Sequence, residues 1–372
     1  MRMLFWSSVT LIFLAYVGYP IYLYMRARLW PRPVLRKSIL PSVSVILAVH
    51  NEEKYLAVKL KNIAGLDYPS EQLQVIVVSD GSTDATNDIL KDWQGPSRIA
   101  VFAPRAGKAA AINLGREAAS GEILVFTDAR QVVAEDALRQ LTANFADPSV
   151  GCVSGELMIG QNQDGSGAAG VGMYWRLEKK IRQWEGLTGS MVGATGALYA
   201  ARRELLVTLP QGTILDDVYV PLQVAREGKR VVFEPQARAF DPVTPNPKQE
   251  FARKLRTLYG NYQLLQLAPW ILTSSNPLRT RFICHKCLRL VVPFALIGTI
   301  VSSFYLGLRT FYDVALVAQL IFYALALFKG YSTKLRILSR MADVSLAFLM
   351  LNSAAALAFV YFVGRKKAVW AR

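Results

Sequence analysis

The sequence predicts an α/β domain with a largely parallel sheet, joined to helices that cross a membrane. From Pro41 to about Gln263, apolar runs of strand length alternate with amphipathic stretches and with turns rich in Gly, Asp and Ser. Such alternation is typical of βα units. Long apolar runs flank this stretch, and the 372 residues combine a mean hydropathy of +0.25 with a formal net charge of +16. Basic soluble proteins are rarely so apolar, so this pairing indicates a membrane protein with basic flanks.

Three apolar runs are predicted to form the buried strands of this sheet. They are Val43–Val49, Leu73–Ser79 and Glu122–Asp128. Each run is nearly uninterrupted and ends in polar residues, as strands covered on both faces do. Ligands of open α/β sheets bind beyond the carboxyl ends of the strands, so the polar residues at these three ends are expected to share one cleft.

Four apolar stretches are long enough to be candidates for membrane crossing: Met3–Tyr24, Leu290–Leu308, Phe311–Phe328 and Val344–Gly364. The first ends in Tyr-Leu-Tyr and basic residues instead of the small-x-small exit of a signal peptide, so it is expected to remain as an anchor. The third is short, which favours a tilted or irregular helix.

Basic residues beside these stretches predict the orientation of the chain. The runs Arg279–Arg289 and Lys329–Arg340 are rich in Lys and Arg, and such flanks face the cytoplasm. The α/β domain is therefore expected on the cytoplasmic side of the cell (inner) membrane, in a multi-pass protein. A crossing by the last stretch would put Arg365–Lys367 outside, against this tendency, so the side of the C-terminus is left open.

The stretch Lys248–Leu265 carries apolar residues at helical spacing opposite Arg253, Lys254 and Arg256, which predicts an amphipathic helix at the membrane surface. The predicted organisation is an anchor over residues 1–25, the α/β domain over 40–247, interfacial amphipathic helices over 248–285 and membrane helices over 286–372.

The high charge and the cysteines exclude two other classes of protein. Basic residues crowd beside apolar runs, as Arg26–Lys37 do, and form no recognisable nucleic-acid module, so no nucleic-acid partner is expected. Three cysteines indicate a reducing compartment without a disulfide framework. The pair Cys284 and Cys287 lacks the further thiols or histidines of a zinc site and is interpreted as structural.

Polar residues at the first two strand ends are the first candidates for a site. The first strand ends in His50–Glu53 and the second in Ser79–Asp84. A turn followed by a helix cap accounts for Thr83 and Asp84. Asp80 is placed at the tip of a buried strand, where its carboxylate can accept hydrogen bonds from a base or a ribose.

Five segments occur in a fixed order along the chain, AVHNEE, VVSDGSTD, RAGKAAAINLG, VFTDAR and LDDVYVPLQVAREGKRVVFEPQARA. Over roughly residues 40–260 the chain thereby resembles glycosyltransferase family 2, in particular its membrane-integrated branch, which includes cellulose, hyaluronan and poly-N-acetylglucosamine synthases. The resemblance implies a GT-A type, Rossmann-like domain that transfers a sugar with inversion from a nucleotide-sugar, a UDP-sugar in this branch.

The resemblance also assigns the donor site. It implies that Glu52 and Asp80 hold the nucleoside and that Lys108 lies near the donor, where a lysine suits a phosphate. The alternative for Lys108 is a solvated lysine at a helix start.

Asp128 and Arg130 stand where the family has Asp-x-Asp for ribose and a divalent metal. Asp128 is the predicted metal ligand, and the loss of the second carboxylate leaves two interpretations. Either Asp128, diphosphate and water hold Mg²⁺ or Mn²⁺, or Arg130 itself supplies positive charge to the leaving nucleotide. The hypothesis is retained metal dependence, because Mg²⁺ often takes only one or two protein carboxylates.

Asp216 and Asp217 match the acidic pair that the family places before a helix. The resemblance implies that Asp217 is the general base, which removes the proton from the acceptor hydroxyl as it attacks the anomeric carbon. Asp216 is expected to bind substrate, although an acidic residue at a helix start also stabilises the helix dipole.

Two further segments concern the acceptor. Processive members carry Gln-x-x-Arg-Trp on an interfacial helix, and here only Arg256 matches, with Thr257 in place of the tryptophan. Arg256 can hold diphosphate, but the aromatic surface for an acceptor sugar is missing, so processive synthesis stays open. Gly193–Ala197 resembles the acceptor-side segment, or is a tight turn with a helix start.

The predicted function is membrane-bound, inverting sugar transfer from a nucleotide-sugar donor to a glycan acceptor in polysaccharide synthesis. The alternatives are a single addition onto a lipid-linked acceptor and an inactive membrane scaffold that binds nucleotide-sugar. Four membrane segments are few for a conduit, so export of a product would need a partner protein or an oligomer.

Overall fold

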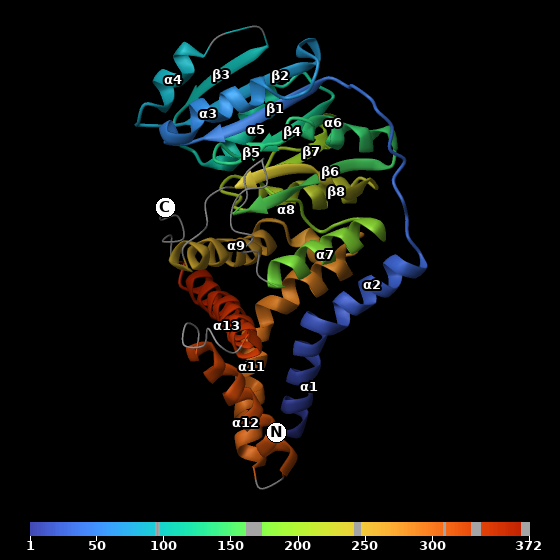
Figure 1. Cartoon of the computed structure of the whole chain (residues 1–372), viewed down its shortest axis with the longest axis vertical. Coiled ribbons are helices and arrows are strands. Elements are labelled where there is room, and N and C mark those ends of the chain that lie inside the picture. Colours follow the sequence, from blue (N-terminus) through green and yellow to red (C-terminus); the bar gives the residue numbers. More distant parts are fainter. Residues whose placement is uncertain are drawn as a thin grey trace.

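A computed structural model describes residues 1–93, 95, 97–160, 173–241, 247–307, 310–328 and 336–365. A sheet flanked by helices lies at one end of the molecule and a bundle of long helices at the other (Figure 1). Helices α7 (Met173–Leu187) and α9 (Pro247–Leu267) form a layer between them. The predicted amphipathic helix therefore exists, and it lies where the sheet domain meets the helix bundle.

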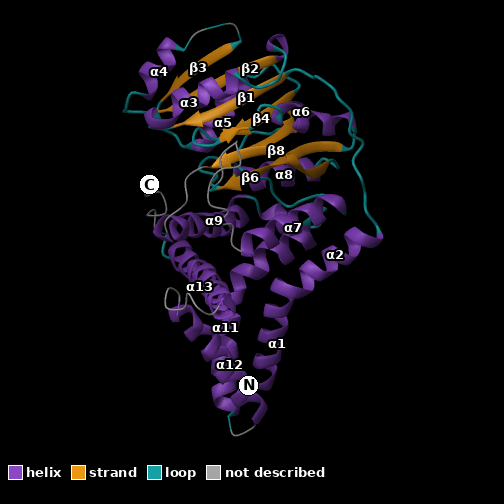
Figure 2. Cartoon of the chain, viewed as in Figure 1, coloured by secondary structure: helices purple, strands orange, loops and turns teal. Residues whose placement is uncertain are grey.

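The sheet has eight strands in the order β3-β2-β1-β4-β7-β6-β8-β5, and Figure 2 shows them as a continuous layer. The strands are β1 Val43–Val49, β2 Leu73–Asp80, β3 Arg98–Ala103, β4 Ile123–Thr127, β5 Val132–Val133, β6 Val150–Ile159, β7 Leu198–Arg202 and β8 Arg230–Asp241. The three strands expected from the apolar runs are β1, β2 and β4.

The sheet is mixed, with parallel strands from β3 to β4 and again between β6 and β8. Strand β7 lies between these two groups and is antiparallel to both β4 and β6. The carboxyl ends of β1, β2 and β4 thus share one edge, as predicted. Strand β1 is covered on both faces, because Ile46 belongs to the core on one side and Val45 and Leu47 to the core on the other.

Short connections lead from the strands into the helices of the sheet domain. These helices are α3 Glu53–Ala64, α4 Thr86–Asp92, α5 Lys108–Ala118, α6 Ala137–Thr142 and α8 Asp216–Arg226. Helices α3, α4, α5 and α8 start close to the polar residues that the sequence singles out, so their first residues are brought to the carboxyl edge of the sheet.

Three helices in the described ranges are long and apolar enough to cross a membrane: Arg2–Leu29, Arg279–Leu306 and Met341–Val363. The first joins α1 (Arg2–Phe13) to α2 (Tyr19–Leu29) through a π-helical turn. The second joins α10 (Arg279–Phe282) to α11 (Leu288–Leu306) in the same way. The third is part of α13 (Arg336–Val363).

The fourth expected crossing, Phe311–Phe328, is only partly a regular helix, since α12 (Thr310–Leu325) has 16 residues and a 3₁₀ turn follows. That length is below the roughly 20 residues that a crossing needs. Its first residues pack at the far end of the bundle, where the ring of Phe311 lies 6.0 Å from that of Phe5.

The last helix ends on the side of the sheet domain. The ring of Phe362 in α13 lies 5.5 Å from that of Tyr262 in α9. Arg365 follows directly, so it lies on the same side as the sheet and the conflict with the distribution of basic residues disappears. The neighbouring basic residues Lys366 and Lys367, like Lys329 and Lys334 before α13, are outside the described residues.

Candidate active site

The ends of β1 and β2 are tied together by hydrogen bonds. His50 Nδ1 lies 2.7 Å from the carbonyl oxygen of Asp80, and the Thr83 amide donates to Asn51 Oδ1 at 2.7 Å. Asn51 has a φ of +54°, a conformation that asparagine tolerates better than most residues. Asp84 accepts from the Thr86 amide at 3.0 Å, which agrees with its interpretation as a turn and cap residue.

Glu52 lies between these tips at the start of α3. Its amide donates to Thr86 Oγ1 at 2.8 Å, and its carbonyl oxygen accepts from the amide of Leu56. The backbone of Glu52 is thereby fixed beside the Asp80 tip. Its contact with a nucleoside stays a prediction.

Asp80 fixes the loop that precedes α5. Its side chain is buried, and Oδ1 accepts hydrogen bonds from the amides of Ala106 at 2.6 Å and Gly107 at 3.0 Å. Gly107 has a φ of +96°, which favours glycine, and it is directly followed by Lys108. Asp80 thus orients the loop that presents Lys108, and the binding of a nucleoside by Asp80 is a further role that stays a prediction.

Lys108 forms ion pairs with carboxylates from two distant parts of the chain. Its Nζ lies 3.1 Å from Asp128 Oδ1 and 3.4 Å from Asp216 Oδ1. Burial opposes the charge of Lys108, but Asp128, Asp216 and Asp217 raise its pKa, so the ammonium is retained. These ion pairs exclude the alternative that Lys108 is only a solvated lysine at the start of a helix.

Asp216 and Asp217 are the first residues of α8 and point to different partners. Asp216 is buried, and its Oδ2 accepts a hydrogen bond from the Tyr199 hydroxyl at 3.2 Å. Asp217 is partly exposed, and its Oδ2 accepts from the Gly196 amide at 3.2 Å. The accessible carboxylate of the pair is therefore Asp217, the residue that the sequence marks as the base.

The segment Gly193–Ala197 holds Asp217 in place. The Ala194 amide donates to the carbonyl oxygen of Asp217 at 2.7 Å, and a Cβ at Gly196 would lie 3.3 Å from Asp217 Oδ2. The small residues therefore allow the Asp217 side chain to approach the backbone, whereas contact of this segment with an acceptor stays a prediction. The alternative of a helix start is wrong, because the segment turns into strand β7.

Burial raises the pKa of Asp217 to about 6, with a further rise caused by Asp216, whereas Lys108 lowers it. A carboxylate with this pKa is ionised at neutral pH and is more basic than an exposed aspartate. Asp217 is therefore matched to accept a proton from a hydroxyl group.

The acid limb of the pH–activity profile tests this assignment. The pKa of Asp217 is raised, so the proton-accepting form is lost as the pH falls through about 6. We expect kcat/KM to fall tenfold per pH unit below that value and to be nearly flat between pH 7 and 8. An acid limb that stays flat down to pH 4.5, in an enzyme that remains folded by circular dichroism, would contradict the assignment.

Asp128 follows the end of β4, and its side chain is 41% exposed. Arg130, two residues on, instead contacts the last residue of β8, since its Nη2 lies 2.5 Å from Asp241 Oδ2. Asp241 is buried and also accepts from Gln131 Nε2 at 3.2 Å. The charge of Arg130 is thus balanced within the protein, which reduces its repulsion of a cation at Asp128.

A divalent ion would have one carboxylate ligand here. The described residues hold no group of three or more His, Cys, Asp or Glu side chains suited to a metal. Asp128 is 41% exposed and its Oδ1 pairs with Lys108, so its other oxygen would hold an ion whose remaining ligands are diphosphate oxygens and water, as is common for Mg²⁺.

Two residues near Asp128 and Asp216 were not recognised in the sequence. Lys59 of α3 is buried and donates to Thr127 Oγ1 at 2.8 Å and to the Gln131 carbonyl oxygen at 2.7 Å. It therefore clamps the turn that carries Asp128, and burial lowers its pKa to about 7. Tyr199, the second, stacks on Phe126 with the ring centroids 4.7 Å apart.

Arg256 lies on the interfacial helix α9 and is exposed. One helical turn further on, Gly260 packs against Leu215, and Gln263 Oε1 accepts from the Ile214 amide at 3.0 Å. Helix α9 therefore supports the loop that leads into Asp216 and Asp217. Binding of diphosphate by Arg256 stays a prediction.

The whole chain resembles a solved enzyme, the mannosyltransferase PcManGT from Pyrobaculum calidifontis in complex with GDP-Man and Mn²⁺. The match covers 98% of this chain and 100% of that one, with a TM-score of 0.75 and 25% identity. Together with the carboxylate cluster at the carboxyl edge of a mixed sheet, this match defines the protein as a glycosyltransferase with a GT-A fold.

The sequence comparisons agree with this class of enzyme. Residues 44–209 match the model of Glycosyl transferase family 2. It is 26% identical to poly-beta-1,6-N-acetyl-D-glucosamine synthase of Staphylococcus aureus over 247 residues, which are 65% of this chain and 60% of that enzyme. It is 25% identical over 237 residues to the probable glycosyltransferase YdaM of Bacillus subtilis, 60% of this chain and 56% of that protein.

Proposed function

We propose that this glycosyltransferase moves a sugar from a nucleotide-sugar to an acceptor hydroxyl with inversion at the anomeric carbon. The observation that carries the proposal is the convergence of Asp128, Asp216 and Asp217 on Lys108. One partly exposed carboxylate, Asp217, is available to take the acceptor proton while the oxygen attacks from the face opposite the leaving nucleotide. A single displacement of this kind inverts the anomeric configuration.

The donor is held by its diphosphate and its nucleoside. Lys108 supplies a positive charge beside Asp128, where the diphosphate would lie, and Glu52 and Asp80 would contact the nucleoside. We propose a UDP-sugar. Since the solved mannosyltransferase is in complex with GDP-Man, release of UDP and GDP from a panel of radiolabelled UDP- and GDP-sugars is the experiment that tests the choice. Transfer from no donor in the panel would contradict the proposal.

A divalent ion would neutralise the leaving diphosphate, and Asp128 would hold it. We expect excess EDTA to lower transfer by at least about tenfold, with recovery on addition of Mg²⁺ or Mn²⁺, because one arginine engaged with Asp241 cannot replace an ion. Donor binding measured by calorimetry with and without the ion gives a second readout. Full activity in excess EDTA would show instead that positively charged side chains suffice to neutralise the leaving diphosphate.

The acceptor is proposed to be a growing glycan, as the name of the staphylococcal relative suggests, although this chain spans only 60% of that enzyme's length. A single addition onto a lipid-linked acceptor is the second candidate. It is favoured by Thr257, which stands where an aromatic residue would stack on an acceptor sugar, and by the small helix bundle. The length of the product made by purified protein distinguishes the two.

We propose that the helix bundle spans the cell (inner) membrane and that the sheet domain faces the cytoplasm. The basic residues Arg26, Arg28, Arg279 and Arg281 lie at the domain end of the first two long helices, which supports this orientation. Protease digestion of sealed inverted vesicles, with antibodies to the sheet domain, tests it.

A further inference from the structure

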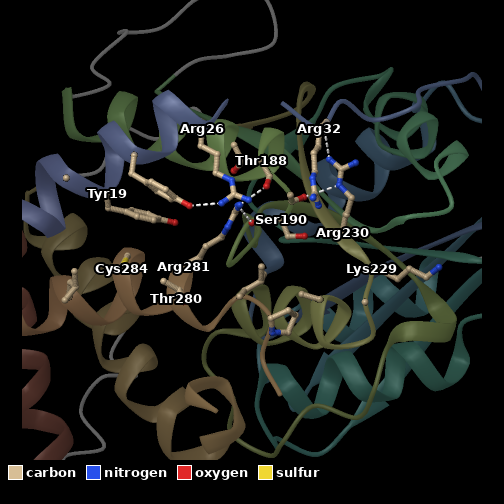
Figure 3. A pocket seen from close by; sticks show the side chains of 18 of the residues that line it. Tyr19, Arg26, Arg32, Thr188, Ser190, Lys229, Arg230, Thr280, Arg281 and Cys284 are labelled. Carbon is tan, nitrogen blue, oxygen red and sulfur yellow. Dashed lines mark hydrogen bonds between the residues drawn. The ribbon is translucent and has the colours of Figure 1, made fainter. Parts of the chain in front are cut away.

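A pocket of about 720 Å³ lies where α2, the α10–α11 helix and the sheet domain meet. Arg26, Arg32, Lys229, Arg230 and Arg281 are among the residues that line it. Figure 3 shows Arg26 beside Arg281, and Arg32 beside Arg230 further from Tyr19. None of the described residues that line the pocket is acidic. The ammonium of Lys229 donates to the Pro148 carbonyl oxygen, so four guanidinium groups remain around the cavity.

Backbone carbonyl groups position two of these arginines without cancelling their charge. Arg281 donates to the carbonyl oxygens of Thr188 and Ser190, each at 2.8 Å. Arg230 donates to those of Gly189 at 3.1 Å and Arg32 at 2.6 Å. The guanidinium groups are therefore held in fixed places in advance of any ligand, which reduces the entropy lost on binding.

Nearby carboxylates offset only part of this charge. Asp147 Oδ2 lies 3.8 Å from Arg230 Nη1, a long contact for an ion pair. Glu185 is buried, and its Oε1 is engaged by His285 Nδ1 at 3.0 Å and by the hydroxyl of the pocket residue Tyr19 at 2.6 Å. The pocket therefore keeps an excess of positive charge that suits an anion.

The opposite wall of the pocket is apolar and faces away from the protein. Leu14 and Tyr22 line it and are 45% and 50% exposed. A second hollow of about 340 Å³ continues along α2, lined by Tyr22, Met25, Arg26 and Trp30. Trp30 is 69% exposed. Exposed Trp and Tyr beside Arg at the end of a long apolar helix are typical of the headgroup level of a bilayer.

We propose that this pocket binds the phosphate headgroup of an anionic membrane lipid. The phosphate would lie among Arg26, Arg32, Arg230 and Arg281, and the acyl chains would follow the apolar face of α1 and α2 past Leu14. A basic pocket between membrane helices on the cytoplasmic side is the kind of site that anionic headgroups occupy. The proposal rests on the membrane embedding and not on the sugar transfer.

The pocket is separate from the candidate active site. Arg230 is the first residue of β8 and Asp241, which contacts Arg130 beside the active site, is the last. A strand of 12 residues spans roughly 35 Å, so the pocket lies at the opposite edge of the sheet. A lipid there would anchor the amino edge of the domain and is not the acceptor.

Lipid titration of the purified full-length protein in detergent, followed by native mass spectrometry, tests the proposal. The probes are dioleoyl phosphatidylglycerol, dioleoyl phosphatidylcholine and inorganic phosphate. We expect phosphatidylglycerol to bind tightly and phosphatidylcholine to bind weakly. The variant Arg26→Gln/Arg32→Gln should bind phosphatidylglycerol about 30-fold more weakly, since each basic residue at a membrane surface contributes roughly a factor of five.

The matched control is Arg28→Gln/Lys37→Gln, which removes two positive charges from exposed residues of the same segment that do not line the pocket. It should bind phosphatidylglycerol as the wild type does. An equal loss of phosphatidylglycerol binding in both double variants would mean that the lipid is attracted to the basic surface in general, which would overturn the proposal. Equal binding of the two lipids by the wild type would also overturn it. Displacement of the lipid by millimolar inorganic phosphate would assign the pocket to a soluble anion. Because binding is measured without a donor, an inactive transferase leaves this result unaffected.

Discussion

Replacing Asp217 by Asn is expected to reduce sugar transfer by about 10²- to 10⁴-fold, as the loss of a general base does. The amide has nearly the same shape, so its contact with the Gly196 amide can be kept if the side-chain oxygen takes the position of Oδ2. The acceptor proton then has no acceptor within reach. Transfer from radiolabelled donor, measured at saturating donor and acceptor, gives the loss in kcat.

Donor binding separates catalysis from folding in this variant. Asp217 does not contact the donor in the proposed arrangement, so the dissociation constant for the nucleotide-sugar, measured by calorimetry, should change less than about threefold. Glu227→Gln is the matched control, because Glu227 is an exposed carboxylate that follows the same helix α8. Asp217→Asn with turnover within a few-fold of this control would reject Asp217 as the base.

Replacing Lys108 by Met is expected to weaken transfer by about 10- to 100-fold in kcat/KM, the range for losing a hydrogen bond between charged groups. The variant leaves Asp128 and Asp216 without their shared cation. The diphosphate of the donor then meets uncompensated negative charge, so most of the loss should appear in the KM for the donor. Initial rates over a range of donor concentrations measure it.

The pH profile shows whether Lys108 acts on the site directly. Lys108 lowers the pKa of Asp217, so its removal should move the acid limb from about 6 to a higher pH. A merely structural lysine would not shift this limb. Lys61→Met, which removes an exposed lysine in the last turn of α3, should change neither KM nor the limb. Unchanged donor KM together with an unchanged limb in Lys108→Met would contradict the proposed role.

The lipid pocket and the active site have independent tests, and their separation has a consequence for mutagenesis. Variants of Arg26 and Arg32 are expected to leave donor KM unchanged in detergent, because Arg230 and Asp241 mark opposite ends of β8. Any effect of these variants on transfer should then appear only in vesicles that contain anionic lipid.

The local sequence pattern was sufficient to predict strands β1, β2 and β4 and the acidic residues that end or follow them. Val43–Val49 and Leu73–Ser79 are apolar over a length suited to a buried strand. A strand that is buried on both faces is apolar throughout, so it needs no alternation of apolar and polar residues to be recognised. Because parallel strands end at one edge, the sequence alone predicts that Asp80 and Asp128 share one cleft. The order of the motifs then added Asp217 and Lys108.

Contacts between distant segments could not be predicted in the same way. Lys59 sits among other lysines on an amphipathic helix, and nothing local shows that its ammonium lies beneath the turn of Asp128. In the sequence, Arg130 only marks the position of a missing metal ligand. The structure shows that it forms an ion pair with Asp241 at the end of β8. The antiparallel strand β7 likewise places Tyr199 behind Asp216 through pairing with β4 and β6, partners that its own residues do not reveal.

The helix bundle shows the same division. Apolar length alone predicted four candidate crossings, one of them short, because the thickness of the hydrocarbon layer sets the number of residues required. In the described residues, three helices are long enough to cross a bilayer. Apolar length could not show that α13 ends beside α9, since this depends on packing between side chains such as Phe362 and Tyr262. Local composition thus determines which segments avoid water, whereas the partners that cover them, and the pKa of Asp217 that results, are set only when distant parts of the chain pack together.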